Sequence, residues 1–151
     1  MMNMEGIIYL HDHRDFSKQV KRSVFWRRMM KSKIMVVEDD KALLLLYKEE
    51  LKAEGYEILS AGNGREAIQK LEEEKPDLII LDIVMPVMDG MEALGRIVRK
   101  YRKIPIIFHT SYPEYQQDFM SWAADAFVVK SADSGKLKET IRGLLEKDRS
   151  H

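Results

Sequence analysis

Five short apolar runs, separated by longer amphipathic segments, constrain the fold of this chain more than any other feature. The runs lie at 33–38, 57–61, 78–82, 105–109 and 126–130. Several are too apolar for strands with one face in water, which favours a parallel sheet covered on both faces. The intervening segments predict helices at 41–54, 64–74, 89–102, 114–123 and 133–147. The sequence therefore predicts an α/β fold, a five-stranded parallel sheet with helices on both sides.

Turn-forming residues fall at the boundaries of these predicted elements. The four prolines are Pro76, Pro86, Pro105 and Pro113, and each falls at the boundary of a predicted element. No repeat, low-complexity tract or linker divides the segment 33–147. We expect this segment to form one domain, followed by a short tail over 148–151.

Residues 1–32 differ in composition from the rest of the chain. They carry seven Lys or Arg residues against three acidic ones, whereas the whole chain has a formal net charge of zero. Phe16, Val20 and Val24 have the spacing of a short amphipathic helix. We expect a basic extension, disordered or partly helical, and a start codon assigned too early is the alternative. If this segment is helical, it is a basic amphipathic helix, of the kind that contacts a membrane surface, a nucleic acid or an acidic partner.

The composition excludes several classes of function. The chain has no cysteine, so disulfides, thiol catalysis and cysteine metal sites are excluded. No apolar run approaches the length of a transmembrane segment, and no signal peptide is visible. A cytoplasmic protein without a DNA-binding domain is the expectation.

Acidic residues follow two of the apolar runs directly. Asp82 ends the run 78–82, and Glu38-Asp39-Asp40 follows the run Ile34-Met35-Val36-Val37. In open α/β sheets, ligands bind and reactions occur beyond the carboxyl ends of the strands. Carboxylates held together repel, so a cation between them is favoured. Oxygen ligands of this kind suit Mg²⁺, and a carboxylate beside that ion can attack phosphorus to form an aspartyl-phosphate.

Two further polar residues complete this predicted site. Thr110 ends the fourth run and Lys130 ends the fifth, so a hydroxyl and an ammonium group should reach the same edge of the sheet. Each alone has an ordinary structural explanation, as a strand-end hydroxyl or a solvated lysine. Together with the acids they provide the positioning and charge that phosphoryl transfer requires.

These residues resemble the receiver domain of response regulators in two-component signalling. The resemblance rests on Glu38-Asp39-Asp40, Asp82 with Met85-Pro86 and Asp89-Gly90, Thr110-Ser111 and Lys130, in the order and spacing of that family over residues 33–147. It implies a flavodoxin-like, doubly wound (βα)5 fold with strand order 2-1-3-4-5. It also implies a stand-alone signalling protein, because the chain ends about twenty residues after Lys130; a fragment of a larger regulator is the alternative.

The resemblance assigns a role to each residue. Asp82 would accept a phosphoryl group from a phosphohistidine on a sensor histidine kinase or histidine phosphotransfer protein. Asp39, Asp82 and the backbone carbonyl of Val84 would bind Mg²⁺ directly, and Glu38 would act through water. The chain would be a signalling protein rather than a dedicated enzyme.

The remaining roles concern the response to phosphorylation. Lys130 would pair with the phosphoryl oxygens and Thr110 would bond to one of them. Phe127 occupies the position of a switching aromatic residue, which turns inward as Thr110 moves. The surface around the fourth helix, fifth strand and fifth helix would then change its affinity for an unidentified protein.

Some positions depart from the family's pattern. Ser131 replaces a proline that usually follows a cis bond, which favours a trans bond after Lys130 because a cis non-proline bond costs about 2.5–4 kcal/mol. Tyr112 and Val84 occupy positions that tune dephosphorylation, and their bulk predicts a long-lived phosphorylated state. Trp122 and Ala123 stand where the family usually has small residues and glycine.

Three other functions were weighed. An aspartyl phosphatase would need a second acid two residues after the nucleophile, where this chain has Val84. A flavodoxin-type cofactor site would not place three acids in its first loop, because they would repel a phosphate. A receiver-like interaction module that is never phosphorylated is the remaining alternative.

Overall fold

The computed structural model describes residues 32–118 and 123–149, so residues 1–31 of the basic extension, Trp122 and the last two residues lie outside the described part. Five parallel strands form one sheet in the order β2-β1-β3-β4-β5. The strands are β1 (Lys33–Val37), β2 (Glu57–Ala61), β3 (Leu78–Leu81), β4 (Ile106–Thr110) and β5 (Ala126–Val129). The predicted doubly wound fold and its strand order are therefore confirmed.

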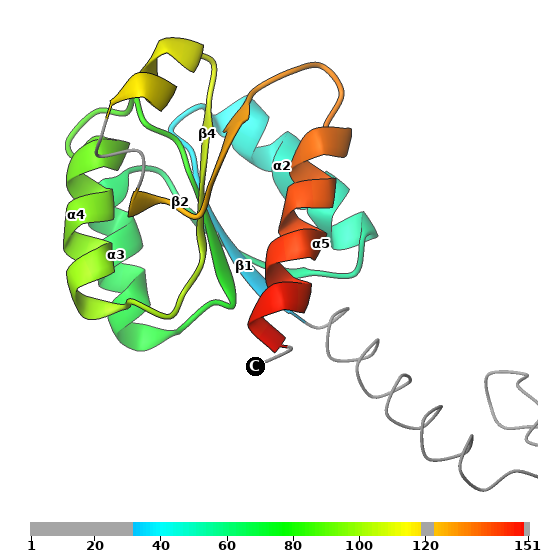
Figure 1. Cartoon of the computed structure of the whole chain (residues 1–151), viewed down its shortest axis with the longest axis horizontal. Helices are drawn as coiled ribbons and strands as arrows, with labels where there is room; N and C mark the ends of the chain where they lie inside the picture. Colours follow the sequence, from blue (N-terminus) through cyan, green and yellow to red (C-terminus); the bar gives the residue numbers. More distant parts are fainter. Residues whose placement is uncertain (1–31, 119–122, 150–151) are drawn as a thin grey trace, which may run out of the picture.

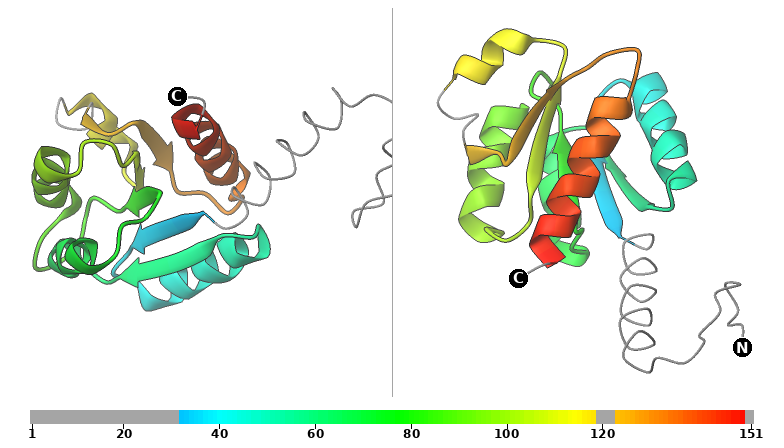
Figure 2. Two further views of the ribbon diagram at one scale, coloured as in Figure 1. Left: turned by 90° about the horizontal axis from the view of Figure 1, so that it is seen from below. Right: turned by 45° about the vertical axis from the view of Figure 1, so that its right-hand side comes forward.

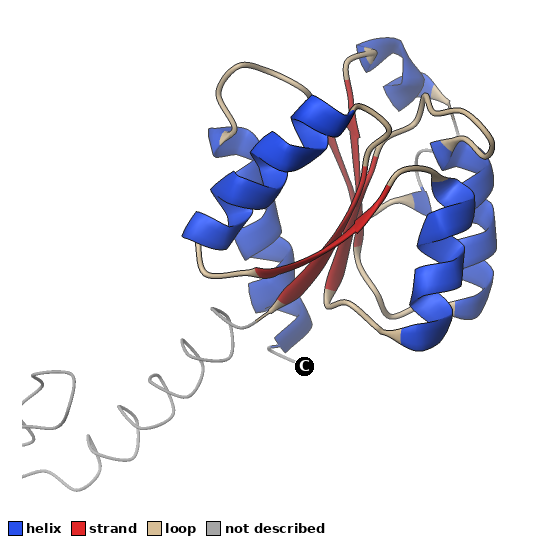
Figure 3. Cartoon of the chain, turned by 180° about the vertical axis from the view of Figure 1, so that it is seen from behind, coloured by secondary structure: helices blue, strands red, loops and turns tan. Residues whose placement is uncertain are grey.

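Helices cover both faces of the sheet (Figure 1). The helices α3 (Gly64–Glu73) and α4 (Gly90–Lys100) lie on one face, and α2 (Lys41–Ala53) and α5 (Gly135–Arg149) lie on the other (Figures 2 and 3). Within the described residues, no helix is both long enough and apolar enough to cross a membrane.

Alternate residues of each strand enter two separate cores. Met35 and Val37 pack with α3 and α4, whereas Ile34 and Val36 pack with α2 and α5. Side chains alternate between faces in a strand, so a run that is apolar at every position must be covered on both sides. All four residues of β3 are buried, as this arrangement requires.

Polar side chains cap the N-terminal ends of three helices. Asp40 accepts from the backbone N–H groups of Ala42 and Leu43, and Asn63 and Asp89 cap α3 and α4 in the same way. Such caps satisfy backbone donors that have no partner inside the helix. Leu45 of α2 points away from the sheet and is 59% exposed.

The fourth predicted helix is the element that differs. A helix was predicted over 114–123, but the described part of this segment is a five-residue 3-10 helix over Pro113–Gln117. Pro113 is tolerated at a helix start, yet no side chain caps this one and none of its residues is buried. Of its residues only Tyr115 packs against the core, so the segment has little of the apolar contact that stabilises most helices in proteins.

Candidate functional site

The predicted site residues lie together at the carboxyl edge of the sheet. Val37 of β1 and Leu81 of β3 are paired, so Glu38 and Asp82 continue adjacent strands. The N–H of Asp82 donates to the carbonyl of Val37 over 3.1 Å, and this bond ties the two strand ends together. The side chains that follow β1 and β3 are thus fixed by backbone pairing.

Three acidic side chains form a cluster at this edge. Carboxylate oxygens of Glu38, Asp39 and Asp82 all lie within 4.8 Å of one another. Glu38 is 3% exposed and Asp82 is 7% exposed, whereas Asp39 is open to solvent. Two carboxylates of the cluster are therefore largely removed from water, where their mutual repulsion is weakly screened.

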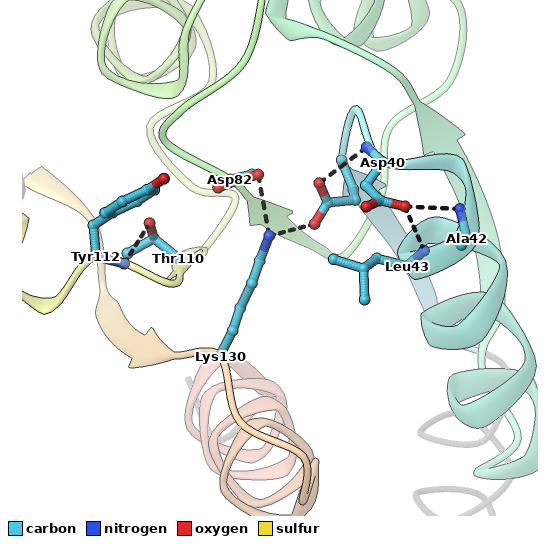
Figure 4. A network of polar contacts seen from close by, with 8 residues as sticks. Asp40, Ala42, Leu43, Asp82, Thr110, Tyr112 and Lys130 are labelled. Atoms are coloured by element: carbon cyan, nitrogen blue, oxygen red, sulfur yellow. Dashed lines mark hydrogen bonds and ion pairs between the residues drawn. The ribbon is translucent and has the colours of Figure 1, made fainter.

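Lys130 extends into this acidic cluster from the end of β5 (Figure 4). Its Nζ donates to Oε1 of Glu38 over 2.5 Å and to Oδ2 of Asp82 over 3.1 Å. Three carboxylates against one ammonium leave a local excess of two negative charges when all four groups are ionised. One divalent cation would neutralise that excess.

The pKa values of the site follow from this crowding. Burial raises the pKa of Glu38, and the charge of Asp82 adds to the rise while the Lys130 hydrogen bond opposes it. Burial also raises the pKa of Asp39, with a further contribution from Glu38. Burial alone would lower the pKa of Lys130, but its hydrogen bond to Glu38 and the charge of Asp82 outweigh it and raise that pKa.

The donor set fits Mg²⁺. It offers only oxygen atoms, it carries a net negative charge, and Asp39 leaves one side of the cluster open to solvent. Mg²⁺ prefers oxygen ligands and keeps several waters, so a site with few protein ligands and an open side suits it. Glu38, Asp39 and Asp82 are the residues that would hold the ion.

The loop after β3 is packed closely against the backbone of Asp82. Gly90 donates its N–H to the carbonyl of Ile83 over 2.7 Å. A Cβ atom at Gly90 would lie 2.1 Å from the carbonyl oxygen of Asp82 and 2.7 Å from Cα of Ile83. Only glycine permits this approach, a constraint that the Asp89-Gly90 pair alone did not reveal.

Thr110 and Phe127 lie on adjacent strands. Thr110 is fully buried, and its Oγ1 accepts from the N–H of Tyr112 over 3.2 Å (Figure 4). Phe127 is paired in register with Phe108, and their rings meet edge to face with centroids 6.4 Å apart. Because Phe108 and Thr110 are two residues apart in β4, Thr110 and Phe127 lie on the same face of the sheet.

The positions that depart from the family's pattern surround this edge. The described residues contain no cis peptide bond, so the Lys130-Ser131 bond is trans, as predicted. Val84 and Tyr112 are 44% and 47% exposed, and the Tyr112 ring meets that of Tyr115 edge to face.

Sequence reasoning missed a buried histidine next to the site. His109 precedes Thr110 in β4, is buried, and meets the Tyr47 ring with centroids 5.1 Å apart. Burial, helped by the charge of Lys130, lowers the pKa of His109 to about 4. The signal available in the sequence was a single polar residue inside the apolar run Ile106-Ile107-Phe108.

Comparison with known proteins identifies the family. Residues 34–142 match the family described as the response regulator receiver domain. The chain is 32% identical over 119 residues to sporulation initiation phosphotransferase F of Bacillus subtilis, covering 78% of this chain and 96% of that protein. It is 30% identical over 120 residues to the alkaline phosphatase synthesis transcriptional regulatory protein PhoP of the same organism, covering 78% of this chain but only 50% of PhoP.

A solved structure agrees with this assignment. The response regulator TrrA of Thermotoga maritima, in complex with Mg²⁺-BeF, is 46% identical with a TM-score of 0.73, covering 75% of this chain and 98% of TrrA. TrrA has also been solved in complex with the histidine kinase ThkA. The match to the family over most of the chain, the strand order and the acidic carboxyl edge agree: this chain belongs to the response regulator receiver family.

Proposed function

We propose that residues 33–147 form the receiver domain and that Asp82 in this domain accepts a phosphoryl group from a phosphohistidine. The neighbouring carboxylates would bind the Mg²⁺ ion that this reaction needs. The main support for this proposal is the contact between the Lys130 ammonium and Asp82, next to the carboxylates of Glu38 and Asp39. A carboxylate held beside a fixed cation at the open edge of a sheet is suited to attack phosphorus.

The side chains of this edge have separate roles in the transfer. Lys130 holds one carboxylate oxygen of Asp82 and leaves the other for the new bond to phosphorus. As that P–O bond forms, the P–N bond to the donor histidine breaks and the electron pair returns to the imidazole. The bound Mg²⁺ supplies positive charge for the phosphoryl oxygens, and positioning and charge dominate this chemistry.

The response to phosphorylation begins at Thr110. Its hydroxyl, near Asp82 at the carboxyl edge, would turn from the N–H of Tyr112 toward the new phosphoryl group. Phe127 shares that face of the sheet and is only partly buried, so space vacated by Thr110 would be available to its ring. The surface around β5 would then favour another protein, in a population shift driven by the added charge.

The phosphoryl donor in this proposal is a histidine kinase or a histidine phosphotransfer protein. The complex of TrrA with its histidine kinase supports the first, since TrrA shares 46% identity with this chain. The protein would act as a signalling domain that also loses its phosphoryl group by hydrolysis. Its cytoplasmic location stays a prediction.

Intact-mass spectrometry tests this function. The protein is incubated with acetyl phosphate and Mg²⁺, alongside Asp82→Asn and the exposed control Glu139→Gln. An adduct of one HPO₃ group should form in the wild type and control, require Mg²⁺, and be absent from Asp82→Asn. If a phosphohistidine donor also yields no adduct, the interaction module that is never phosphorylated becomes the better explanation.

A further inference from the structure

A basic cavity lies at the opposite edge of the sheet from Asp82. Its volume is about 900 Å³ with the solvent at its mouth included, and its lining comes from the last turn of α4 and from the connections before β3 and β4. The lining residues are Lys75, Arg99, Lys100, Tyr101, Arg102, Lys103 and Ile104. Five of these seven residues are cationic and none is acidic, although the chain as a whole is neutral.

Most of these cations have no carboxylate partner in the described part of the chain. Lys100 pairs with Glu72 over 2.7 Å, but no ion pair involves Arg99, Arg102 or Lys103 there. The ammonium of Lys75 donates to the main-chain carbonyl of Leu71 at the end of α3 and interacts at longer range with Glu72. The three remaining cations around the cavity therefore have no acidic partner among the described residues.

Helix stabilisation accounts for only part of this cluster. Arg99 and Lys100 lie in the last turn of α4, where a positive charge interacts favourably with the helix dipole. Lys75 donates to a carbonyl in the last turn of α3, so it stabilises that helix end in the same way. Arg102 and Lys103 lie beyond the end of α4 and gain little from its dipole, which falls off within the last turn.

Tyr101 adds a buried hydroxyl group at the cavity. Its oxygen makes no hydrogen bond of standard geometry, alone among the buried side-chain polar atoms of the described residues, although the ammonium of Lys100 interacts with it. The ammonium groups of Lys75 and Lys100 lie 4.7 and 5.6 Å from the centre of its ring. A buried polar atom without a well-formed hydrogen bond is uncommon and calls for an explanation such as a missing ligand.

We propose that this cavity binds an anion carrying two or more phosphate groups, such as a diphosphate. Two guanidinium groups present planar pairs of N–H donors that match phosphate oxygens, and two lysines add charge. The Tyr101 hydroxyl would gain a partner in a phosphate oxygen. A free nucleoside diphosphate and a phospholipid headgroup with two phosphate groups share this chemistry.

NMR titration of the full ¹⁵N-labelled chain tests the proposal. The probes are inorganic pyrophosphate, ADP and vesicles containing cardiolipin, whose headgroup carries two phosphates, with phosphatidylcholine vesicles as reference. EDTA is present throughout so that no Mg²⁺ occupies the Asp82 edge. Saturable shifts should centre on the amides of Lys75 and residues 99–104. Binding of the soluble probes indicates a free phosphate ligand, and binding of anionic vesicles alone indicates a lipid headgroup; both support the proposal.

Variants assign the binding to the cavity. Arg99→Gln/Arg102→Gln should weaken binding by about tenfold or more, and Tyr101→Phe, which keeps the ring, by about threefold or more. Arg65→Gln/Lys52→Gln removes the same charge from exposed positions on other helices and should leave binding within about twofold. The proposal is overturned if no probe binds saturably, if the shifts centre on the Asp82 edge, or if the control variant weakens binding equally.

Discussion

The Nζ atom of Lys130 lies 2.5 Å from Oε1 of Glu38, although these residues follow β5 and β1 and two other strands separate them in the sheet. This contact crosses the carboxyl edge and passes beside Asp82. Lys130 therefore compensates two buried carboxylates at once. Its charge stabilises the folded domain as well as serving the proposed phosphoryl transfer.

Replacement of Lys130 by methionine should separate these two effects. In EDTA, the free energy of unfolding should fall by about 3 kcal/mol, because Glu38 and Asp82 lose their buried counter-ion. With Mg²⁺, transfer from acetyl phosphate should slow by about a hundredfold, since a fixed cation at the reacting oxygens is removed. Urea unfolding and intact-mass time courses measure the two quantities.

A second lysine provides the control for that variant. Lys138 lies on α5 and pairs over 3.6 Å with Glu54, a more exposed partner, so Lys138→Met should change stability by less than about 1 kcal/mol. Added Mg²⁺ should restore stability to Lys130→Met more than to the wild type, because its acidic cluster carries one more negative charge. Equal stability of Lys130→Met and wild type in EDTA would contradict the assignment.

Gly90 should not tolerate even a methyl group. Alanine there would place Cβ within 3 Å of three backbone atoms of Asp82 and Ile83, which cannot rotate away as a side chain can. We expect Gly90→Ala to reduce the free energy of unfolding by about 2 kcal/mol and to slow phosphorylation by displacing Asp82. Denaturant unfolding and the acetyl phosphate reaction give both results.

Gly95 of the same helix is the matched control. No heavy atom lies within 4 Å of the Cβ that alanine would add there. Gly95→Ala should stabilise the domain by about 0.5–1 kcal/mol, because alanine loses less backbone entropy in a helix. If both glycine variants were destabilised equally, helix α4 itself rather than the contact with Asp82 would be the cause.

The buried His109 predicts a loss of stability in mild acid. Its pKa is about 4 in the folded protein against 6.5 for an unperturbed histidine, so between these values the unfolded chain binds the extra proton. Stability is therefore retained above pH 6.5 and lost as the pH falls toward 4. The loss attributable to His109 should reach about 3 kcal/mol at the lower pH.

His109→Leu should remove that contribution. Urea unfolding in EDTA gives the free energy of unfolding of the variant and of the wild type at each pH. The difference, variant minus wild type, should rise as the pH is lowered from 7 to 4. Tyr47→Phe keeps both the histidine and the edge-to-face contact, so it should retain the wild-type pH dependence. A pH dependence unchanged in His109→Leu would show that other groups cause the loss.

The fold was largely predictable because its signal is repeated. Four of the five apolar runs have Ile, Val, Leu or Phe at half or more of their positions, and a doubly covered parallel strand buries these residues on both faces. The fourth predicted helix differs in its described part, because Glu114 to Asp118 contain a single apolar side chain, that of Tyr115, and no side chain caps the segment. The prediction there rested on the regular alternation of elements alone.

The sequence was enough to predict which residues of the site lie close together. It was not enough to predict which of their atoms form hydrogen bonds. Strand ends in a parallel sheet share one edge, so Asp82, Glu38 and Lys130 were bound to be near one another. The hydrogen bond from Lys130 to Glu38 depends on the conformation of a long side chain, and the His109–Tyr47 contact depends on how α2 packs on β4. Neither leaves a local signal in the sequence.

The phosphorylated state is predicted to be long-lived. Val84 and Tyr112 flank the Asp82 edge with large, partly exposed side chains, and neither carries a carboxylate or amide that would orient an attacking water. Water exclusion slows hydrolysis of the aspartyl-phosphate, so its half-life should be minutes or longer.

The double variant Tyr112→Ala/Val84→Asn should shorten this half-life by about tenfold. The control Leu45→Ala, which changes an exposed apolar residue on α2, should leave it unchanged. Loss of the mass adduct after removal of acetyl phosphate measures the half-life, and a wild-type half-life of seconds would mean that these side chains do not shield the phosphoryl group.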